Sequence, residues 1–166
     1  MAKITLKGKP FRTVGDLPAV GSQAPDFRLV DADMNDVGLA SYAGKKKILT
    51  INPSFDTPVC AAAARKFNEK ASALGDTVVL AISTDLPFAQ KRFCTAEGLE
   101  SVIPLSIMRS KHFAKDYGVL IEDGPLAGIT ARAIVVLDAD DKVVHSQLVE
   151  EIAEEPDYEA AIKVVS

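Results

Sequence analysis

Two short runs of apolar residues most restrict what this chain can fold into. Residues 48–51 read Ile-Leu-Thr-Ile, and residues 77–83 read Thr-Val-Val-Leu-Ala-Ile-Ser. Runs of this length are typical of strands that are buried on both faces. Between the two runs, apolar residues recur at the spacing of a helix packed by one face, at positions 60, 63, 64, 67, 71 and 74. The chain is therefore expected to build a sheet with helices on its faces.

The remaining patterns extend this arrangement in both directions along the chain. Before the first run we expect a β-hairpin within residues 3–14 that turns at Gly8-Lys9, a strand near 27–31 and a helical turn near 41–43. After the second run we expect helices at 87–97 and 111–117, strands at 102–107, 132–138 and 142–149, and a last helix from about 156. The predicted fold class is α/β, with a mixed central sheet in a single domain spanning 1–166.

Composition excludes several classes of protein. Hydrophobic residues make up 48% and charged residues 25% of the chain, which is average for globular proteins, and no run of about 18 apolar residues suggests a membrane span. The net charge is −4, and the basic run 45–47 is too short for a nucleic-acid surface. The first residues lack the apolar centre of a signal peptide, so we expect a cytoplasmic protein.

The side chains available for metal binding are few. The two cysteines and two histidines stand at unrelated spacings, so the sequence predicts no metal site, and it predicts no cofactor. Two cysteines are also too few for a disulfide-stabilised secreted fold, so any importance they have is chemical. Four carboxylates at 150, 151, 154 and 155 are expected to form a solvated face, with a partner-binding patch as the alternative.

Cys60 stands where the predicted helix begins. Pro58 suits the first helical position, which makes Thr57 the N-cap and places Cys60 in the first turn. Unpaired backbone N–H groups and the positive end of the helix dipole favour a thiolate there. We expect the carboxylate of Asp56 to point away from the sulfur. The alternative is that Cys60 is a small apolar residue on the buried face of its helix.

Cys94 and Arg132 are less clearly marked by their surroundings. Cys94 follows Cys60 by 34 positions, on a helix whose Ala89, Phe93 and Ala96 are expected to face the core. Local evidence favours a buried structural thiol there over a reactive one. Arg132 opens an apolar strand, either as a solvated strand end or as a permanent cation that could hold a thiolate.

The longer sequence pattern resembles a known family. Pro53, Thr57 and Cys60 form a Pro-x-x-x-Thr-x-x-Cys pattern that resembles the peroxidatic motif of peroxiredoxins. Further segments at 65–68, 83–94, 117–138 and 156–161 resemble the thiol peroxidase subfamily, the atypical 2-Cys peroxiredoxins. The resemblance covers essentially the whole chain.

This resemblance implies a thioredoxin-like fold, a homodimer and an antioxidant role in reducing hydrogen peroxide and organic hydroperoxides, with thioredoxin as the reductant. By the same resemblance, Cys60 is peroxidatic and Cys94 is resolving, so that an intramolecular Cys60–Cys94 disulfide forms. Pro53 shields the pocket floor, Thr57 hydrogen-bonds the sulfur and the peroxide, and Arg132 is the cation beside the thiolate.

Two other functions stay open at this point. A redox sensor or adaptor could use the same cysteine pair to change shape and bind a partner without catalytic recycling. A non-redox thioredoxin-like binding module would keep both cysteines as core residues.

Overall fold

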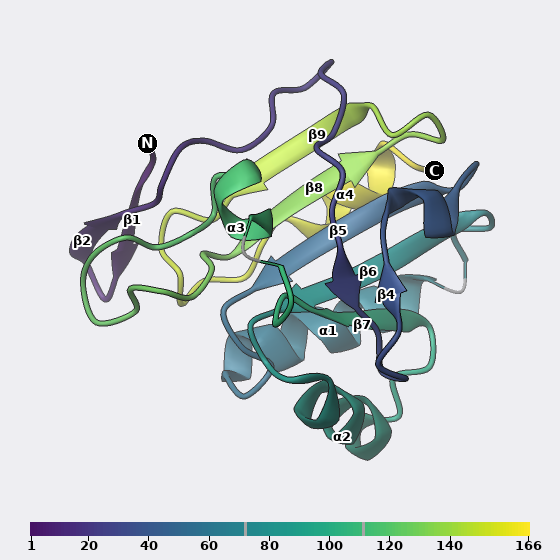
Figure 1. The fold of residues 1–166 in the computed structure, drawn as a ribbon, viewed down its shortest axis with the longest axis horizontal. Helices are drawn as coiled ribbons and strands as arrows, with labels where there is room; N and C mark the ends of the chain where they lie inside the picture. Colours follow the sequence, from purple (N-terminus) through teal and green to yellow (C-terminus); the bar gives the residue numbers. More distant parts are fainter. Residues whose placement is uncertain (72, 111) are drawn as a thin grey trace.

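The computed structural model describes residues 1–71, 73–110 and 112–166. Its main sheet has seven strands in the order β4-β3-β7-β6-β5-β8-β9, and a separate two-stranded sheet pairs β1 with β2 (Figure 1). The strands are β1 (Lys3–Leu6), β2 (Lys9–Arg12), β3 (Leu29–Val30), β4 (Asp36–Val37), β5 (Lys46–Asn52), β6 (Thr77–Ser83), β7 (Val102–Ser106), β8 (Ala133–Leu137) and β9 (Val143–Leu148). The helices are the 3₁₀ helix η1 (Leu39–Tyr42) and the α-helices α1 (Pro58–Ala71), α2 (Pro87–Glu97), α3 (Phe113–Asp116) and α4 (Tyr158–Lys163).

The main sheet is mixed, as predicted. Strands β5, β6 and β7 run parallel, while β8 pairs antiparallel with β5 on the other side. In the parallel register Asn52 pairs with Ser83, and Ser83 with Ser106, so the carboxyl ends of these strands lie at one edge. The edge outside the carboxyl ends of parallel strands is where α/β proteins commonly bind their ligands.

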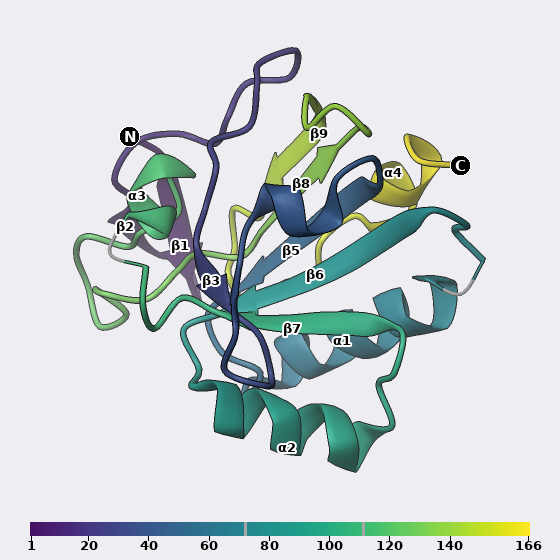
Figure 2. The same cartoon turned by 45° about the vertical axis from the view of Figure 1, so that its right-hand side comes forward.

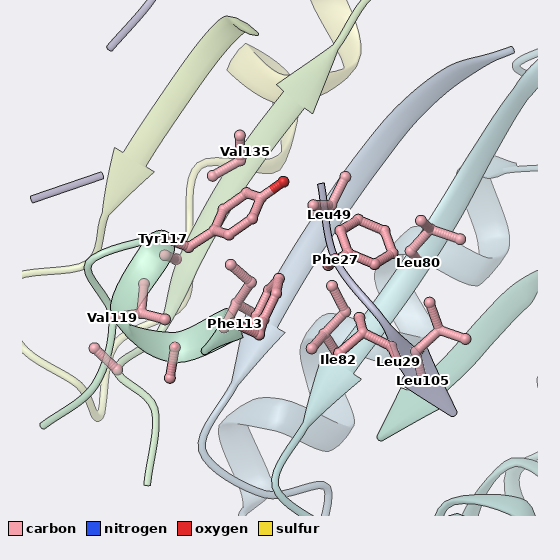
Figure 3. Packing of buried hydrophobic residues seen from close by; sticks show 14 of the residues in the cluster. Phe27, Leu29, Leu49, Leu80, Ile82, Leu105, Phe113, Tyr117, Val119 and Val135 are labelled. Carbon is pink, nitrogen blue, oxygen red and sulfur yellow. The ribbon is translucent and has the colours of Figure 1, made fainter. Parts of the chain in front are cut away.

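Alternate residues of the central strands enter two separate cores, because successive side chains of a strand point to opposite faces. Ile48 and Val79 pack against Phe67 of α1 and Ala161 of α4. Leu49 and Leu80 pack on the other face, where Phe27, Phe113 and Tyr117 cover the sheet (Figure 3). Figure 2 shows α1 and α2 on the same side of the sheet, and α3 on the opposite side. Burial on both faces explains why these strands read as continuous apolar runs.

The N-terminal hairpin is confirmed, with its turn one residue earlier than predicted. Leu6 pairs with Lys9, so Lys7 and Gly8 form the turn. Both have positive φ values, 52° and 78°, which is the conformation of the two-residue turns that match the twist of hairpin strands.

Two elements, β6 and α2, have the predicted bounds, and the others differ at their ends. Strand β5 begins two residues before the apolar run, and β3 is confined to Leu29–Val30. Helix α4 begins at Tyr158 rather than near 156 because Asp157 caps it, accepting a hydrogen bond from the Ala160 amide at 3.0 Å. Helix α3 begins at Phe113, and residue 111, its predicted start, lies outside the described residues.

The predicted core face of α2 is wrong for two of its three residues. Ala89 and Ala96 are exposed, whereas Phe93 is half-buried and packs against the core, and the polar Gln90 is fully buried. The Gln90 side chain donates hydrogen bonds to Ser83 Oγ at 2.9 Å and to the Leu105 carbonyl at 2.8 Å. These bonds offset the cost of burying an amide, so a polar residue occupies the inner face.

Across the described ranges, no helix combines the length and apolar character needed to cross a membrane.

Candidate active site

The residues between β5 and α1 form the first part of the site, and they confirm the predicted helix start. Pro58 is the first residue of α1, and the Thr57 hydroxyl accepts a hydrogen bond from the Cys60 amide at 3.2 Å. The same hydroxyl donates to the Ser54 carbonyl at 3.2 Å. A hydroxyl has one proton, so the Thr57 O–H must turn away from the Ser54 carbonyl before it can donate to the sulfur or to a peroxide.

Cys60 and Asp56 lie in opposite environments although they are four residues apart in the sequence. The Cys60 side chain is 0% exposed, whereas Asp56 is exposed to solvent. Water screens an exposed carboxylate, so Asp56 has little influence on a buried sulfur. The amide of Cys60 lies in the first helical turn, where the helix dipole favours negative charge.

Arg132 reaches the sulfur because β8 pairs with β5. Ala133 is opposite Ile51, so the residue before β8 lies beside the end of β5. From there the Arg132 guanidinium donates to Cys60 Sγ at 2.9 Å across 72 residues of sequence. Its Nε donates to the Ile152 carbonyl at 3.0 Å, and Nη1 also donates to Asn52 Oδ1 at 3.3 Å. Strand pairing therefore brings a fixed cation to the start of α1.

The charge of Arg132 has no carboxylate partner among the described residues. The side chain is only 2% exposed, and the salt bridges of the described chain do not include it. A guanidinium stays protonated, and a buried charge is costly unless it is paired. The sulfur of Cys60, as a thiolate, is the group positioned to balance that charge.

An open pocket of about 270 Å³ lies against Thr57 and Arg132. Pro53 and Ser54 contribute to it from the loop before α1. Its remaining walls are largely apolar and come from distant parts of the chain, namely Leu6, Pro58, Val59, Leu126, Ile129, Ile152 and Ala153. Pro53, Thr57 and Arg132, the three residues that the family resemblance placed beside Cys60, thus line one pocket, and Arg132 also contacts the buried Cys60 sulfur.

Asp85 fixes the loop that leads to Cys60, and it was not among the predicted site residues. Its carboxylate accepts hydrogen bonds from Ser54 Oγ at 2.7 Å, from the Phe55 amide at 2.7 Å and from Ser83 Oγ at 2.8 Å. Asn52 was also missed. Both polar residues follow or end buried strands at the carboxyl edge of the sheet, a position that could have singled them out.

Cys94 lies on α2, and both cysteines are free thiols in the structure. Its side chain is half-buried against the core beneath α1 and α4, and burial raises the pKa of its thiol to about 11. The ring of the neighbouring Phe93 packs at a tilt of 32° against Phe55 of the loop before α1, with ring centroids 5.1 Å apart. The two cysteines are therefore carried by separate helices, and α2 contacts the loop before α1 through Phe93.

Comparison with known proteins agrees with this arrangement. Residues 19–162 match the family model described as Redoxin. A thiol peroxidase from Mycobacterium bovis is 56% identical over 162 residues, which is 98% of this chain and 97% of that protein. Among solved structures, a peroxiredoxin-like protein from Aquifex aeolicus is 38% identical with a TM-score of 0.93, covering 99% of this chain and 96% of its own. A thiol peroxidase from Chromobacterium violaceum is 27% identical with a TM-score of 0.90, and the match covers 98% of this chain and 94% of that protein.

Proposed function

The chain belongs to the Redoxin family, and from this premise we propose the cycle by which it acts as a thiol-dependent peroxidase, with Cys60 as the residue that is oxidised. Peroxide reduction by a thiol is the activity that its thiol peroxidase relatives support. One observation carries the assignment of Cys60: a buried guanidinium without a carboxylate partner in the described chain lies 2.9 Å from its sulfur.

In the first step the Cys60 thiolate attacks the terminal oxygen of a hydroperoxide. The new S–O bond forms as the O–O bond breaks, and the leaving oxygen takes a proton and departs as water or an alcohol. Cys60 is left as a sulfenic acid. Arg132 stabilises negative charge on the sulfur and on the peroxide oxygens without exchanging its own proton.

In the second step the Cys94 thiol attacks the Cys60 sulfenic acid. An S–S bond forms, and the sulfenic oxygen leaves as water with two protons. A disulfide needs Cα atoms within about 7 Å. Because Cys60 is fully buried on α1 and Cys94 lies on α2, the proposal includes local unwinding of one of these helices before the bond forms. The first turn of α1 and the exposed α2 are the two segments that could yield.

The apolar lining of the pocket favours organic hydroperoxides as substrates in addition to hydrogen peroxide. Leu126, Ile129 and Ile152 offer an apolar surface next to Arg132. Burying the organic part of a substrate against such a surface is favourable, whereas hydrogen peroxide gains nothing from it.

The remaining parts of the proposal rest on the family. A thioredoxin would reduce the Cys60–Cys94 disulfide by thiol exchange, which returns both cysteines to thiols. A homodimer, a cytoplasmic location and a single domain over residues 1–166 belong to the same proposal. Sedimentation of the reduced protein at micromolar concentration tests the dimer, and a pure monomer would refute it.

A coupled assay tests the activity. Peroxide consumption is followed with thioredoxin, thioredoxin reductase and NADPH, using hydrogen peroxide and cumene hydroperoxide in parallel. We expect many turnovers per protein and a higher second-order rate constant for the organic substrate. A single oxidation without recycling by thioredoxin or another dithiol would instead favour a redox sensor.

A further inference from the structure

The N-terminal hairpin is joined to the segment after β9 by one side chain, Glu151. Its carboxylate accepts hydrogen bonds from Thr5 Oγ1 at 2.5 Å, from the Lys7 amide at 2.8 Å and from the Gly8 amide at 3.2 Å. Successive backbone N–H groups in such a turn form a concave site for an anion, and here the anion is supplied by the same chain. These bonds lower the pKa of Glu151, and the bond from the Thr5 hydroxyl has the largest effect.

This contact adjoins the pocket next to Cys60 through the sequence neighbours of the bonded residues. Leu6, which stands between the Glu151-bound residues Thr5 and Lys7, lines the pocket. Ile152, which follows Glu151, lines it as well, and its carbonyl accepts the Arg132 Nε hydrogen bond at 3.0 Å. One carboxylate therefore connects an apolar wall of the pocket with the segment that orients the cation.

Attachment of the hairpin does not by itself require this side chain. The Thr5 amide donates to the Glu150 carbonyl at 2.7 Å, and the Ile152 amide donates to the Thr5 carbonyl at 2.9 Å. These backbone bonds hold β1 against residues 150–152. What Glu151 adds is a fixed position for the turn, and thus for Leu6 just before it.

On the basis of the proposed function, we infer that Glu151 is a positioning residue for substrate choice: it holds the β1–β2 turn so that Leu6 forms one wall for the organic part of an alkyl hydroperoxide. Hydrogen peroxide has no organic part and does not use this wall. Loss of Glu151 is therefore expected to lower the rate constant for the alkyl hydroperoxide relative to that for hydrogen peroxide.

The test measures second-order oxidation of Cys60 by rapid quenching and intact mass spectrometry, with cumene hydroperoxide and with hydrogen peroxide. In Glu151→Ala we expect the ratio of the two rate constants to fall roughly tenfold, the scale of losing part of a hydrophobic pocket wall. Glu151→Gln, which keeps the size of the side chain, serves if the alanine variant does not fold. Glu154→Ala is the matched control, because it removes the same charge from the exposed segment and leaves the hairpin bonds in place.

Leu6→Ala completes the experiment as a double-mutant cycle. We expect Leu6→Ala to lower the ratio to a similar extent, and the double variant to lower it little further, because both changes act through one wall. An unchanged ratio in a folded Glu151 variant, or fully additive losses, would overturn the inference. If the wild type oxidised Cys60 with neither peroxide, the proposed function itself would fail, which is a separate result.

Discussion

The two cysteines occupy opposite ends of their helices. Cys60 is in the first turn of α1, fully buried, with its sulfur 2.9 Å from a guanidinium nitrogen of Arg132. Cys94 is in the last turn of α2, where its carbonyl accepts a hydrogen bond from the Leu99 amide at 2.9 Å and Gly98 ends the helix at φ 65°. The helix dipole favours a thiolate at the first position and opposes it at the second.

Among the described residues, a guanidinium contacts the sulfur of Cys60, whereas burial is what shifts the pKa of the Cys94 thiol. Burial raises the pKa of Cys94 to about 11, so this thiol stays protonated near neutral pH. Full burial beside Arg132 leaves Cys60 the better placed of the two to attack a peroxide. In the proposed cycle this contrast sets the order of reaction: Cys60 reacts first from the folded state, and Cys94 reacts after a local rearrangement.

The largest expected effect comes from removing the prepared thiol. Cys60→Ser should reduce peroxide turnover to the uncatalysed background and leave the fold intact, because the swap is nearly isosteric but removes the thiolate. Peroxide consumption and circular dichroism measure the two properties. Substantial residual peroxidase activity would contradict the assignment of Cys60.

Removing the second thiol should stop recycling without stopping the first step. In Cys94→Ser, one equivalent of peroxide should add one oxygen to the protein, whereas the wild type should lose two hydrogens as it forms the disulfide. Excess peroxide should then drive Cys60 of the variant to the sulfinic acid, which thioredoxin does not reverse. Intact mass spectrometry decides between these outcomes. A wild type with one stable added oxygen and a free Cys94 would make Cys94 a structural thiol.

The cation is expected to have the next largest effect. Arg132→Met should slow oxidation of Cys60 by about 100-fold, the scale on which removing one preorganised donor to a developing charge acts. The rate is measured by rapid quenching. Thermal unfolding is the control for stability, because the variant also loses the hydrogen bonds that Arg132 donates to Ile152 and Asn52. An unchanged rate in the folded variant would remove Arg132 from the site.

The N-cap of α1 should have a smaller effect. Thr57→Val keeps the shape of the side chain but removes the hydroxyl that caps the Cys60 amide, and a lost cap costs about 1 kcal/mol. We expect oxidation of Cys60 to slow by about fivefold, the rate equivalent of about 1 kcal/mol lost from the transition state. Thr57→Ser is the matched control and should stay near the wild-type rate. Equal rates in the valine and serine variants would mean that the hydroxyl has no role.

The smallest effect concerns the pH dependence of stability. Because the pKa of Cys94 is raised to about 11 in the folded state, the unfolded chain loses this proton first as pH rises. The stabilisation is therefore complete below the ordinary thiol pKa and is lost between about pH 9 and about pH 11. Urea unfolding gives the free energy of unfolding of the reduced wild type and of Cys94→Ser. Over that pH range the free energy of the wild type should fall relative to that of the variant. A constant difference would mean that Cys94 is solvated like a free thiol.

Local sequence determined much of this protein, because local bonds fix local structure. The bounds of β6 and α2 followed from apolar runs and from Pro87, and the start of α1 followed from Thr57 and Pro58, whose effects act within a few residues. The class of fold also followed, since strands that are apolar throughout need cover on both faces.

Tertiary structure alone decided which distant residues meet. The inner face of α2 could not be read from its apolar residues, because Gln90 is buried by hydrogen bonds to β6 and β7 that its own helix does not reveal. Likewise Arg132 and Leu6 reach the pocket through the pairing of β8 with β5 and of β1 with residues 150–152. The physical reason is that strand order and register depend on contacts across the whole chain, whereas capping and periodicity depend on neighbours within one or two turns.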